Sequence, residues 1–366
     1  MMAETGTGLA LSGGGFRAAL FNLGSLWRLN ELGMLSSVKR ITSVSGGSIT
    51  NAVLALHWPE LHFSGGIADN FSTVVAQPLM RFCLKGIDIS AGLSGLFSPR
   101  SGIGGQLEAR YRQGLFGAAT LQDLPDESRN PAFVFYATSL QTGASVRMSR
   151  KYLADYKLGM LDLPALPLAR VVAASSGFPP WLSPVYIDTD PCQWRITQGA
   201  LRSGDPALRR RMVLTDGGVY DNMGLESVWR RYDTVLVSDA GKPFAINPTP
   251  SSSWPRQLLR VLDICTEQQR ALRKRQLLGE LHNGVRKGAY WGIASAIGNY
   301  GLADPMSQDS ARSRQLAGIR TRLNRFSEEE QGMLVNWGYA LADAALRRHL
   351  ARGSKAGAWP FPQFAL

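Results

Sequence analysis

The N-terminal part of the chain alternates short apolar runs with helical patterns, and this alternation restricts the folds that the chain can adopt. Residues 8–11 form an apolar run that predicts a strand, and after a glycine-rich turn a helix is expected from about Arg17 to Leu32. A second strand over 40–44 leads into a second helix over 48–57. Strands that alternate with helices form parallel sheets with helices on both faces. The sequence therefore predicts an α/β fold with a three-layer α/β/α core and a mainly parallel central sheet.

Composition divides the remainder of the chain. The loosely patterned segment 58–105, in which Gly, Ser and Phe are mixed, predicts an insertion that caps the core and is a candidate lid. Beyond residue 251 the pattern becomes helical and basic. We expect a core over residues 6–245 and a mainly helical, basic C-terminal extension over 246–366 that packs on it. Further strands are expected at 132–138, 145–149, 212–215 and 234–238, and further helices at 166–175, 223–231, 255–282 and 327–352.

The charge of the chain is strongly unbalanced. Lys and Arg number 40 against 28 Asp and Glu among 366 residues, which gives a formal net charge of +12. Such an excess attracts anionic membranes or nucleic acid, although basic clusters also occur on ordinary solvated helix faces. No recognised nucleic-acid-binding motif accompanies the charge, so we expect peripheral contact with an anionic membrane surface and no nucleic acid. Four aromatic residues are candidate interfacial anchors, each with a core position as the alternative: Trp254, Tyr290, Trp291 and Trp337.

Cysteine usage and the lack of long apolar runs bear on location. Cys83, Cys192 and Cys265 are odd in number and too scattered for a metal site, which suits a reducing compartment. Residues 1–7 carry no basic region typical of a signal peptide, and no apolar run approaches the roughly 18 residues of a membrane span. We expect a cytoplasmic protein, peripheral at membranes, that uses no cofactor and no metal.

The segment Ser43-Val44-Ser45-Gly46-Gly47 joins the second strand to the second helix. A sharp strand-to-helix turn lifts a serine hydroxyl clear of the sheet if the residues two positions before and after it are small. Gly47 meets this requirement, and Ser43 is a small residue where a glycine is usual. Ser45 is therefore a candidate nucleophile, provided that a base takes its proton. The alternative is a helix N-terminus that Ser45 merely caps.

Asp216-Gly217-Gly218 follows another apolar run and supplies a candidate base. An aspartate has an ordinary pKa of about 3.9, and burial in an apolar cavity raises that pKa toward the working pH of a general base. The two glycines allow the backbone to approach the site closely. A simple turn after a strand is the alternative, and Asp221 and Asp239 are the other candidate carboxylates.

Histidine is the usual base in serine hydrolases, which raises the alternative of a Ser-Asp-His triad. The chain order serine, aspartate, histidine would select His282 or His349, and both lie in basic helical stretches where a surface histidine is the usual explanation. His57 follows the second helix and His62 lies in the insertion. Because none of these positions is distinctive, we favour a Ser–Asp dyad.

The Ser-Gly-Gly-Gly-Phe-Arg segment 12–17 lies between the first strand and the first helix. Backbone N–H groups at a helix N-terminus stabilise the oxyanion that forms when a serine attacks an ester. The same loop also fits the dinucleotide-binding pattern through Gly13, Gly15 and Ala18. That alternative requires an acidic residue at the end of the second strand to bind a ribose, where the chain has residues 43–45, Ser-Val-Ser, instead.

Four blocks of the sequence resemble the patatin-like phospholipases, a family related to the cytosolic phospholipases A. The blocks are residues 12–17, the turn around Ser45, the Ala-Ser-Ser-Gly-Phe-Pro-Pro segment 174–180, and the Asp-Gly-Gly segment 216–218. The resemblance implies that Ser45 is the nucleophile and Asp216 the base. It also implies an oxyanion hole supported by the first glycine loop, with Gly13, Gly14, Gly15, Arg17 and Gly46 as its candidate members.

The resemblance further implies a lipid acyl hydrolase of the phospholipase A or lysophospholipase type. Such an enzyme cleaves fatty-acyl esters, above all those of phospholipids, through an acyl-serine intermediate. Two hypotheses of other kinds stand beside it. One is a nucleotide-dependent enzyme that uses the glycine loop, and the other is a catalytically silent or externally activated lipid-binding effector module with the same fold.

Overall fold

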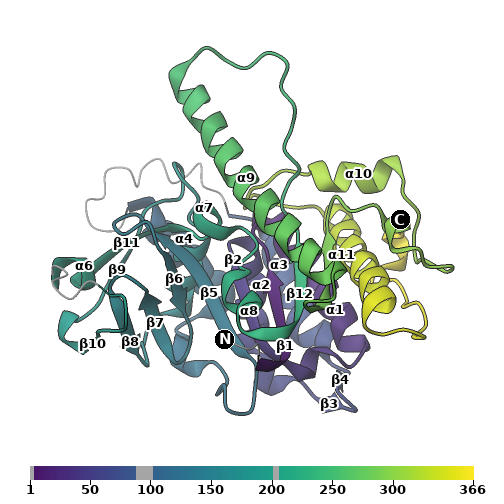
Figure 1. Ribbon diagram of the computed structural model, residues 1–366, viewed down its shortest axis with the longest axis horizontal. Coiled ribbons are helices and arrows are strands. Elements are labelled where there is room, and N and C mark those ends of the chain that lie inside the picture. Colours follow the sequence, from purple (N-terminus) through teal and green to yellow (C-terminus); the bar gives the residue numbers. More distant parts are fainter. Residues whose placement is uncertain (1–3, 88–101, 201–205) are drawn as a thin grey trace.

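The computed structural model describes residues 4–87, 102–200 and 206–366 of the chain (Figure 1). Its main sheet contains 11 strands. The central strands are parallel and lie in the order β13 (Lys287–Gly292), β12 (Tyr232–Asp239), β1 (Glu4–Leu11), β2 (Val38–Val44) and β5 (Ala132–Ser139). Antiparallel strands continue beyond β5 as β6 (Ser145–Met148), β7 (Tyr152–Asp155), β8 (Gly159–Asp162) and β10 (Trp194–Arg195). The main sheet has one branch, in which β11 (Arg211–Asp216) pairs with both β5 and β9 (Val185–Asp188). A separate two-stranded sheet is formed by β3 (Phe63–Ser64) and β4 (Ile67–Ala68).

Alternate residues of the central strands face two separate hydrophobic layers. Leu9 and Leu11 of β1 join the larger core, whereas Ala10 joins a smaller core on the other face. In β12, Leu236 joins the larger core and Val235 the smaller one. These layers confirm the predicted three-layer α/β/α fold. The larger core includes residues of α1 (Gly15–Glu31), α2 (Gly46–Leu56), α5 (Leu168–Ser176) and α11 (Glu328–His349), and the smaller includes residues of α8 (Glu226–Trp229) and α9 (Trp254–His282).

The C-terminal helix α11 packs against α1 so closely that only glycine fits at the contact. A Cβ atom on Gly24 would overlap the carbonyl oxygen of Val335, and one on Gly338 would overlap that of Phe21. The helix begins at a capping box, in which Ser327 and Glu330 exchange hydrogen bonds. The helical C-terminal region is thus part of the packing of the first helix.

The insertion over 58–105 is described up to residue 87 and from residue 102, and the rest of this candidate lid lies outside the described residues. Its described part enters the larger core, where the ring centroid of Phe82 lies 5.6 Å from that of Phe16 in α1. The remaining helices of the described chain are α3 (Gln77–Lys85), α4 (Gly102–Tyr111), α6 (Pro206–Arg210), α7 (Gly218–Asp221) and α10 (Ala311–Gly318).

Several elements were not predicted, among them the antiparallel strands β7, β8, β9 and β10, and two elements that flank the central strands also differ from the sequence prediction. The helix expected over 223–231 is confined to the single turn of α8, because residues 223–225 form a bend in which two backbone N–H groups donate to the carboxylate of Asp221. The strand β13 was not predicted and lies parallel to β12 at the edge of the central sheet. Its sequence, Lys-Gly-Ala-Tyr-Trp-Gly, has weak strand propensity, so the pairing with β12 decides its conformation.

Three of the four candidate interfacial aromatics occupy the core positions that were the alternative for them. Tyr290, Trp291 and Trp337 are buried, and their polar atoms donate hydrogen bonds to Asp239, Ser25 and Ile293, respectively. Trp254, at the start of α9, is exposed. Within the described ranges, no helix combines the length and the apolarity that crossing a bilayer requires.

Candidate active site

Ser45 occupies a sharp turn between β2 and α2. Its backbone has φ 52° and ψ −122°, a conformation that side-chain-bearing residues seldom adopt. The turn requires glycine on its helical side, because a Cβ on Gly47 would lie 2.5 Å from the carbonyl oxygen of Leu11. A Cβ on Gly46 would likewise overlap the carbonyl oxygen of Gly15. The first glycine loop and the Ser45 turn are therefore in direct backbone contact.

Ser43, where a glycine is usual, is accommodated by hydrogen bonds. Its hydroxyl accepts from the Ser48 hydroxyl and from the side-chain amide of Asn51, both at 2.9 Å. These two donors lie on α2, so Ser43 ties the end of the strand to the helix that follows. A small residue other than glycine is thus compatible with the turn at this position.

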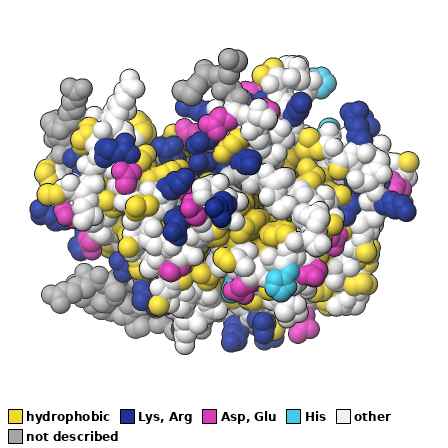
Figure 2. All heavy atoms as spheres, turned by 90° about the horizontal axis from the view of Figure 1, so that it is seen from below, with side chains coloured by type: hydrophobic (Ala, Val, Ile, Leu, Met, Phe, Trp, Pro, Cys, Tyr) yellow, Lys and Arg dark blue, Asp and Glu magenta, His cyan; other side chains and the backbone are white. Residues whose placement is uncertain are grey.

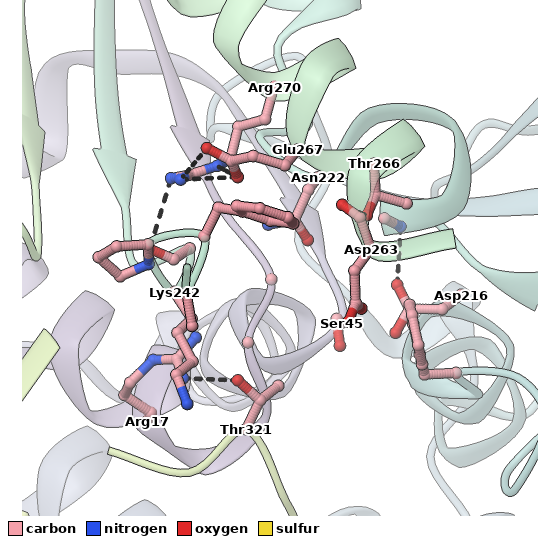
Figure 3. A pocket seen from close by; sticks show the side chains of 18 of the residues that line it. Arg17, Ser45, Asp216, Asn222, Lys242, Asp263, Thr266, Glu267, Arg270 and Thr321 are labelled. Atoms are coloured by element: carbon pink, nitrogen blue, oxygen red, sulfur yellow. Dashed lines mark hydrogen bonds and ion pairs between the residues drawn. The ribbon is translucent and has the colours of Figure 1, made fainter. Parts of the chain in front are cut away.

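Asp216 is the last residue of β11 and lies beside Ser45 (Figure 3). Its Oδ1 accepts a hydrogen bond from the Gly218 N–H at 2.7 Å. Burial raises the pKa of Asp216 to about 7, and the hydrogen bonds with Gly218 and with the Ser45 side chain oppose this rise. A carboxyl group with this pKa can take up and release a proton near neutral pH.

The Ala-Ser-Ser-Gly-Phe-Pro-Pro segment connects the two loops that carry Ser45 and Asp216. One acceptor, the carbonyl oxygen of Ser175, receives the N–H of Ser45 at 3.1 Å and the N–H of Gly217 at 3.2 Å. The carbonyl oxygen of Gly177 receives the N–H of Asp216 at 3.0 Å. The end of α5 therefore fixes the separation of the two side chains. The sequence marked this block but did not reveal its role.

The glycine loop lies against the Ser45 turn and supplies further backbone N–H groups. The N–H of Gly13 donates to the carbonyl oxygen of Asn222 at 2.9 Å, so it is already occupied. Among the described residues, no acceptor is hydrogen-bonded to the N–H of Gly14, Gly15 or Gly46. These three groups lie at the N-termini of α1 and α2, where backbone N–H groups and the helix dipoles favour an anion.

Arg17, in the first turn of α1, ties the end of the glycine loop to two distant segments of the chain. Its guanidinium donates to the carbonyl oxygen of Ala240 through Nε and Nη2, and to the carbonyl oxygen of Ile319 through Nη1 at 2.7 Å. Nη1 also donates to the hydroxyl of Thr321. Burial lowers the pKa of Arg17 to about 10, and Asp239 opposes the change, so the group stays cationic at neutral pH.

The other candidate bases are engaged elsewhere. Asp221 accepts the N–H groups of Met223 and Leu225, and Asp239 accepts a hydrogen bond from Tyr290 and pairs with Arg270. Both carboxylates therefore hold loops in place.

A cavity of about 420 Å³ opens over Ser45 and Asp216. One side is formed by the glycine loop and the Asp216 turn, and the other by residues 241–245 and the side of α9 (Figure 3). None of the four histidines lines this cavity, and no described residue of the candidate lid does so. The residues that line the cavity are Gly13, Gly14, Arg17, Ser45, Phe178, Asp216, Gly218, Asn222, Gly241, Lys242, Pro243, Phe244, Ala245, Arg260, Asp263, Thr266, Glu267, Arg270 and Thr321.

Comparison with known proteins agrees with this geometry. Residues 9–229 match the sequence family described as patatin-like phospholipase. The chain belongs to the patatin-like phospholipase family. Membership supports a lipid acyl hydrolase and disfavours the dinucleotide-binding alternative for the glycine loop. No curated protein matches this patatin-like chain.

The fold of this patatin-like chain is similar to that of human GIVD cytosolic phospholipase A2, with a TM-score of 0.54 at 14% identity over 94% of this chain. The same human protein in complex with methyl gamma-linolenyl fluorophosphonate gives a TM-score of 0.53 at 16% identity over 94% of this chain. The patatin-like chain spans 59% and 58% of these two structures, respectively. VipD from Legionella pneumophila matches with a TM-score of 0.42 at 15% identity, over 95% of this chain and 68% of that one.

Sequence patterns did not reveal two parts of this patatin-like site. Asn222 lies next to the glycine loop: a Cβ atom on Gly13 would be only 2.5 Å from the Oδ1 of Asn222. No sequence motif marks Asn222. The wall formed by α9 was predicted only as a basic helix. Its charged side chains reach the cavity because the chain returns from β12 over the carboxyl ends of the central strands.

Proposed function

We propose that the chain is a serine lipid acyl hydrolase of the phospholipase A or lysophospholipase type, with a Ser45–Asp216 dyad. The observation that carries the proposal is the Ser175 carbonyl oxygen, which accepts from both Ser45 and Gly217 and so holds the hydroxyl beside a carboxyl group of near-neutral pKa. Fatty-acyl esters of phospholipids are the proposed substrates. Peripheral action at a membrane from the cytoplasm is part of the proposal, and the three unpaired cysteines support a reducing compartment.

In the first half of the reaction, the Asp216 carboxylate takes the proton of the Ser45 hydroxyl as Oγ attacks the ester carbonyl carbon. The carbonyl oxygen becomes an oxyanion near the N–H groups of Gly14, Gly15 and Gly46. Preorganised donors of this kind are typically worth about 3 kcal/mol each in the barrier. The intermediate collapses, the ester C–O bond breaks, and the leaving alcohol takes the proton from Asp216.

In the second half, water attacks the acyl-Ser45 ester. Asp216 again serves as the base and takes a proton from the water. The new intermediate collapses, the bond between Ser45 Oγ and the acyl carbon breaks, and Oγ recovers the proton from Asp216. The fatty acid leaves and the free enzyme is restored. Arg17 is a positioning residue in this scheme, because it holds the loop that carries the donors of Gly14 and Gly15.

The test is labelling with a fluorophosphonate ester, followed by identification of the modified peptide. The proposal expects one adduct, on Ser45, and no adduct in Ser45→Ala. Asp216→Asn should label slowly, because its amide cannot take the proton. If folded wild-type protein forms no adduct, with or without phospholipid vesicles, the dyad is wrong and the silent or externally activated module is favoured.

A further inference from the structure

Helix α9 extends away from the body of the molecule at its N-terminal end, together with the loop that precedes it (Figure 1). Along its 29 residues, Leu277 near the other end is the buried side chain. Large apolar side chains on the outer part face solvent: the exposed fractions are 91% for Ile246, 76% for Trp254, 63% for Leu258 and 53% for Val261. Trp254, Leu258 and Val261 are four and three residues apart and therefore share one face of the helix. Exposed apolar side chains gathered in this way mark an interaction site.

The same segment is basic. Residues 242–264 carry three cationic side chains, Lys242, Arg256 and Arg260, against one carboxylate, that of Asp263, which lines the cavity. On the face turned away from this end of α9, cationic and acidic side chains are intermingled (Figure 2). A projecting helix with tryptophan, aliphatic side chains and cations has the chemistry of segments that bind at the interface of an anionic bilayer.

The projecting segment also forms part of the catalytic cavity. Phe244, Ala245 and Arg260 line the cavity that opens over Ser45. The ring of Phe244 lies beneath the guanidinium of Arg260, 3.9 Å from centroid to Cζ, which connects the loop to the helix. A bilayer that contacted the outer part of α9 would thus lie next to the cavity. A lipid could pass from one to the other along a single surface.

We propose that the outer part of α9 and the preceding loop, residues 242–264, form the surface that docks the enzyme on an anionic phospholipid bilayer and places the cavity over its substrate. This inference rests on the proposed lipid hydrolysis. A second copy of the chain is a less suitable binding partner for this surface than an anionic bilayer, because two such surfaces would bring cations against cations.

The test replaces three exposed apolar side chains that do not line the cavity, in the variant Ile246→Ser/Leu258→Ser/Val261→Ser. The matched control is Leu140→Ser/Leu163→Ser/Val285→Ser, which removes three comparably exposed side chains elsewhere. Thermal unfolding checks that both variants are folded. Binding is measured by cosedimentation with phosphatidylcholine vesicles, with and without phosphatidylglycerol, in a Ser45→Ala background so that it does not depend on turnover. Hydrolysis is measured on vesicle lipid and on a water-soluble short-chain ester.

The expected result is a loss of about tenfold or more in affinity for anionic vesicles in the first variant, and none in the control. With Ser45 present, hydrolysis of vesicle lipid should fall in parallel, while that of the soluble ester is retained. Arg256→Gln should lower the affinity for anionic vesicles by about fivefold and leave the weak binding to neutral vesicles unchanged.

Equal vesicle affinity in the first variant and the control would overturn the docking surface. A second result would also overturn it. In this case the wild-type protein does not bind anionic vesicles but forms a dimer, or a complex with an added protein, that the first variant cannot form. Failure of the proposed function is a separate outcome. In that case the soluble ester is not hydrolysed and Ser45 is not labelled, whatever the vesicle binding.

Discussion

Replacing Asp216 by Asn should make the protein more stable and nearly inactive, and the gain in stability should depend on pH. Asparagine keeps the shape of the side chain, and its Oδ1 can still accept the Gly218 N–H. It removes the ionisable group that burial holds at a pKa of about 7, against 3.8 for an ordinary aspartate. Because the folded state binds this proton more tightly than the unfolded state, the contribution of Asp216 to stability is largest at low pH. It is lost as the pH rises from about 4 to about 7.

The size of the effect follows from the two pKa values. A gap of about 3 pKa units corresponds to about 4 kcal/mol of destabilisation of the wild type above pH 7, relative to a neutral side chain. Between pH 5 and pH 8, the difference in free energy of unfolding between Asp216→Asn and wild type should grow by about 2.5 kcal/mol. Urea unfolding at the two pH values measures this growth.

The matched control is Asp188→Asn, which removes an exposed aspartate whose pKa is lowered by its hydrogen bond with Arg211. Its effect on stability should not increase in the same direction between the two pH values. If the difference for Asp216→Asn stayed constant within about 0.5 kcal/mol, the raised pKa of Asp216 would be refuted. In the same experiments kcat/KM of the wild type should rise with pH, reach half its maximum near pH 7 and level off above about pH 8, whereas Asp216→Asn should be at least about a hundredfold less active.

Three further substitutions test the geometry of the site. Ser45→Gly should abolish turnover but raise the free energy of unfolding by about 1 kcal/mol, because glycine adopts φ 52° without strain; chemical denaturation measures the gain, and a loss of stability would contradict it. Gly338→Ala should lower stability by about 2 kcal/mol, because its Cβ would overlap the carbonyl oxygen of Phe21; an unchanged melting temperature would show that α11 can move away from α1. Arg17→Lys should lower kcat/KM by about tenfold, because a lysine cannot reach both Ala240 and Ile319; retention of full activity would remove the bracing role.

The sequence was sufficient to predict the parts of the fold and site that depend on local patterns. The alternation of strands and helices near the N-terminus predicts the parallel centre of the sheet. Gly15, Gly46 and Gly47 mark close backbone contacts, which only this residue type permits. The end of β11 brings Asp216 beside Ser45, as the motif order suggested. That Ser45 and Asp216 carry the chemistry is still a prediction, which the labelling experiment tests.

The parts that could not be predicted depend on contacts between distant segments. Tyr290 and Trp291 have the composition of an interfacial cluster, but the strand that carries them pairs with β12 and buries both. In α9, the same mixture of arginine and aliphatic residues fits a solvated helix, a core helix or a cavity wall. Only its position above the central strands distinguishes them. Likewise, nothing local shows that the carbonyl oxygen of Ser175 would bridge two loops.

The bracing of Arg17 has a consequence for the biosynthesis of the protein. Arg17 leaves the ribosome early, but Ile319, whose carbonyl oxygen it binds, follows 302 residues later. At roughly 5–20 residues per second, that interval lasts about 15–60 s. In the last third of this interval the growing chain already contains Ser45 and Asp216, but it still lacks the contacts that hold Arg17, and α1 lacks its partner α11. We therefore expect the site to reach its final geometry only after the segment from Ile319 to the end of α11 has been made and has packed on α1.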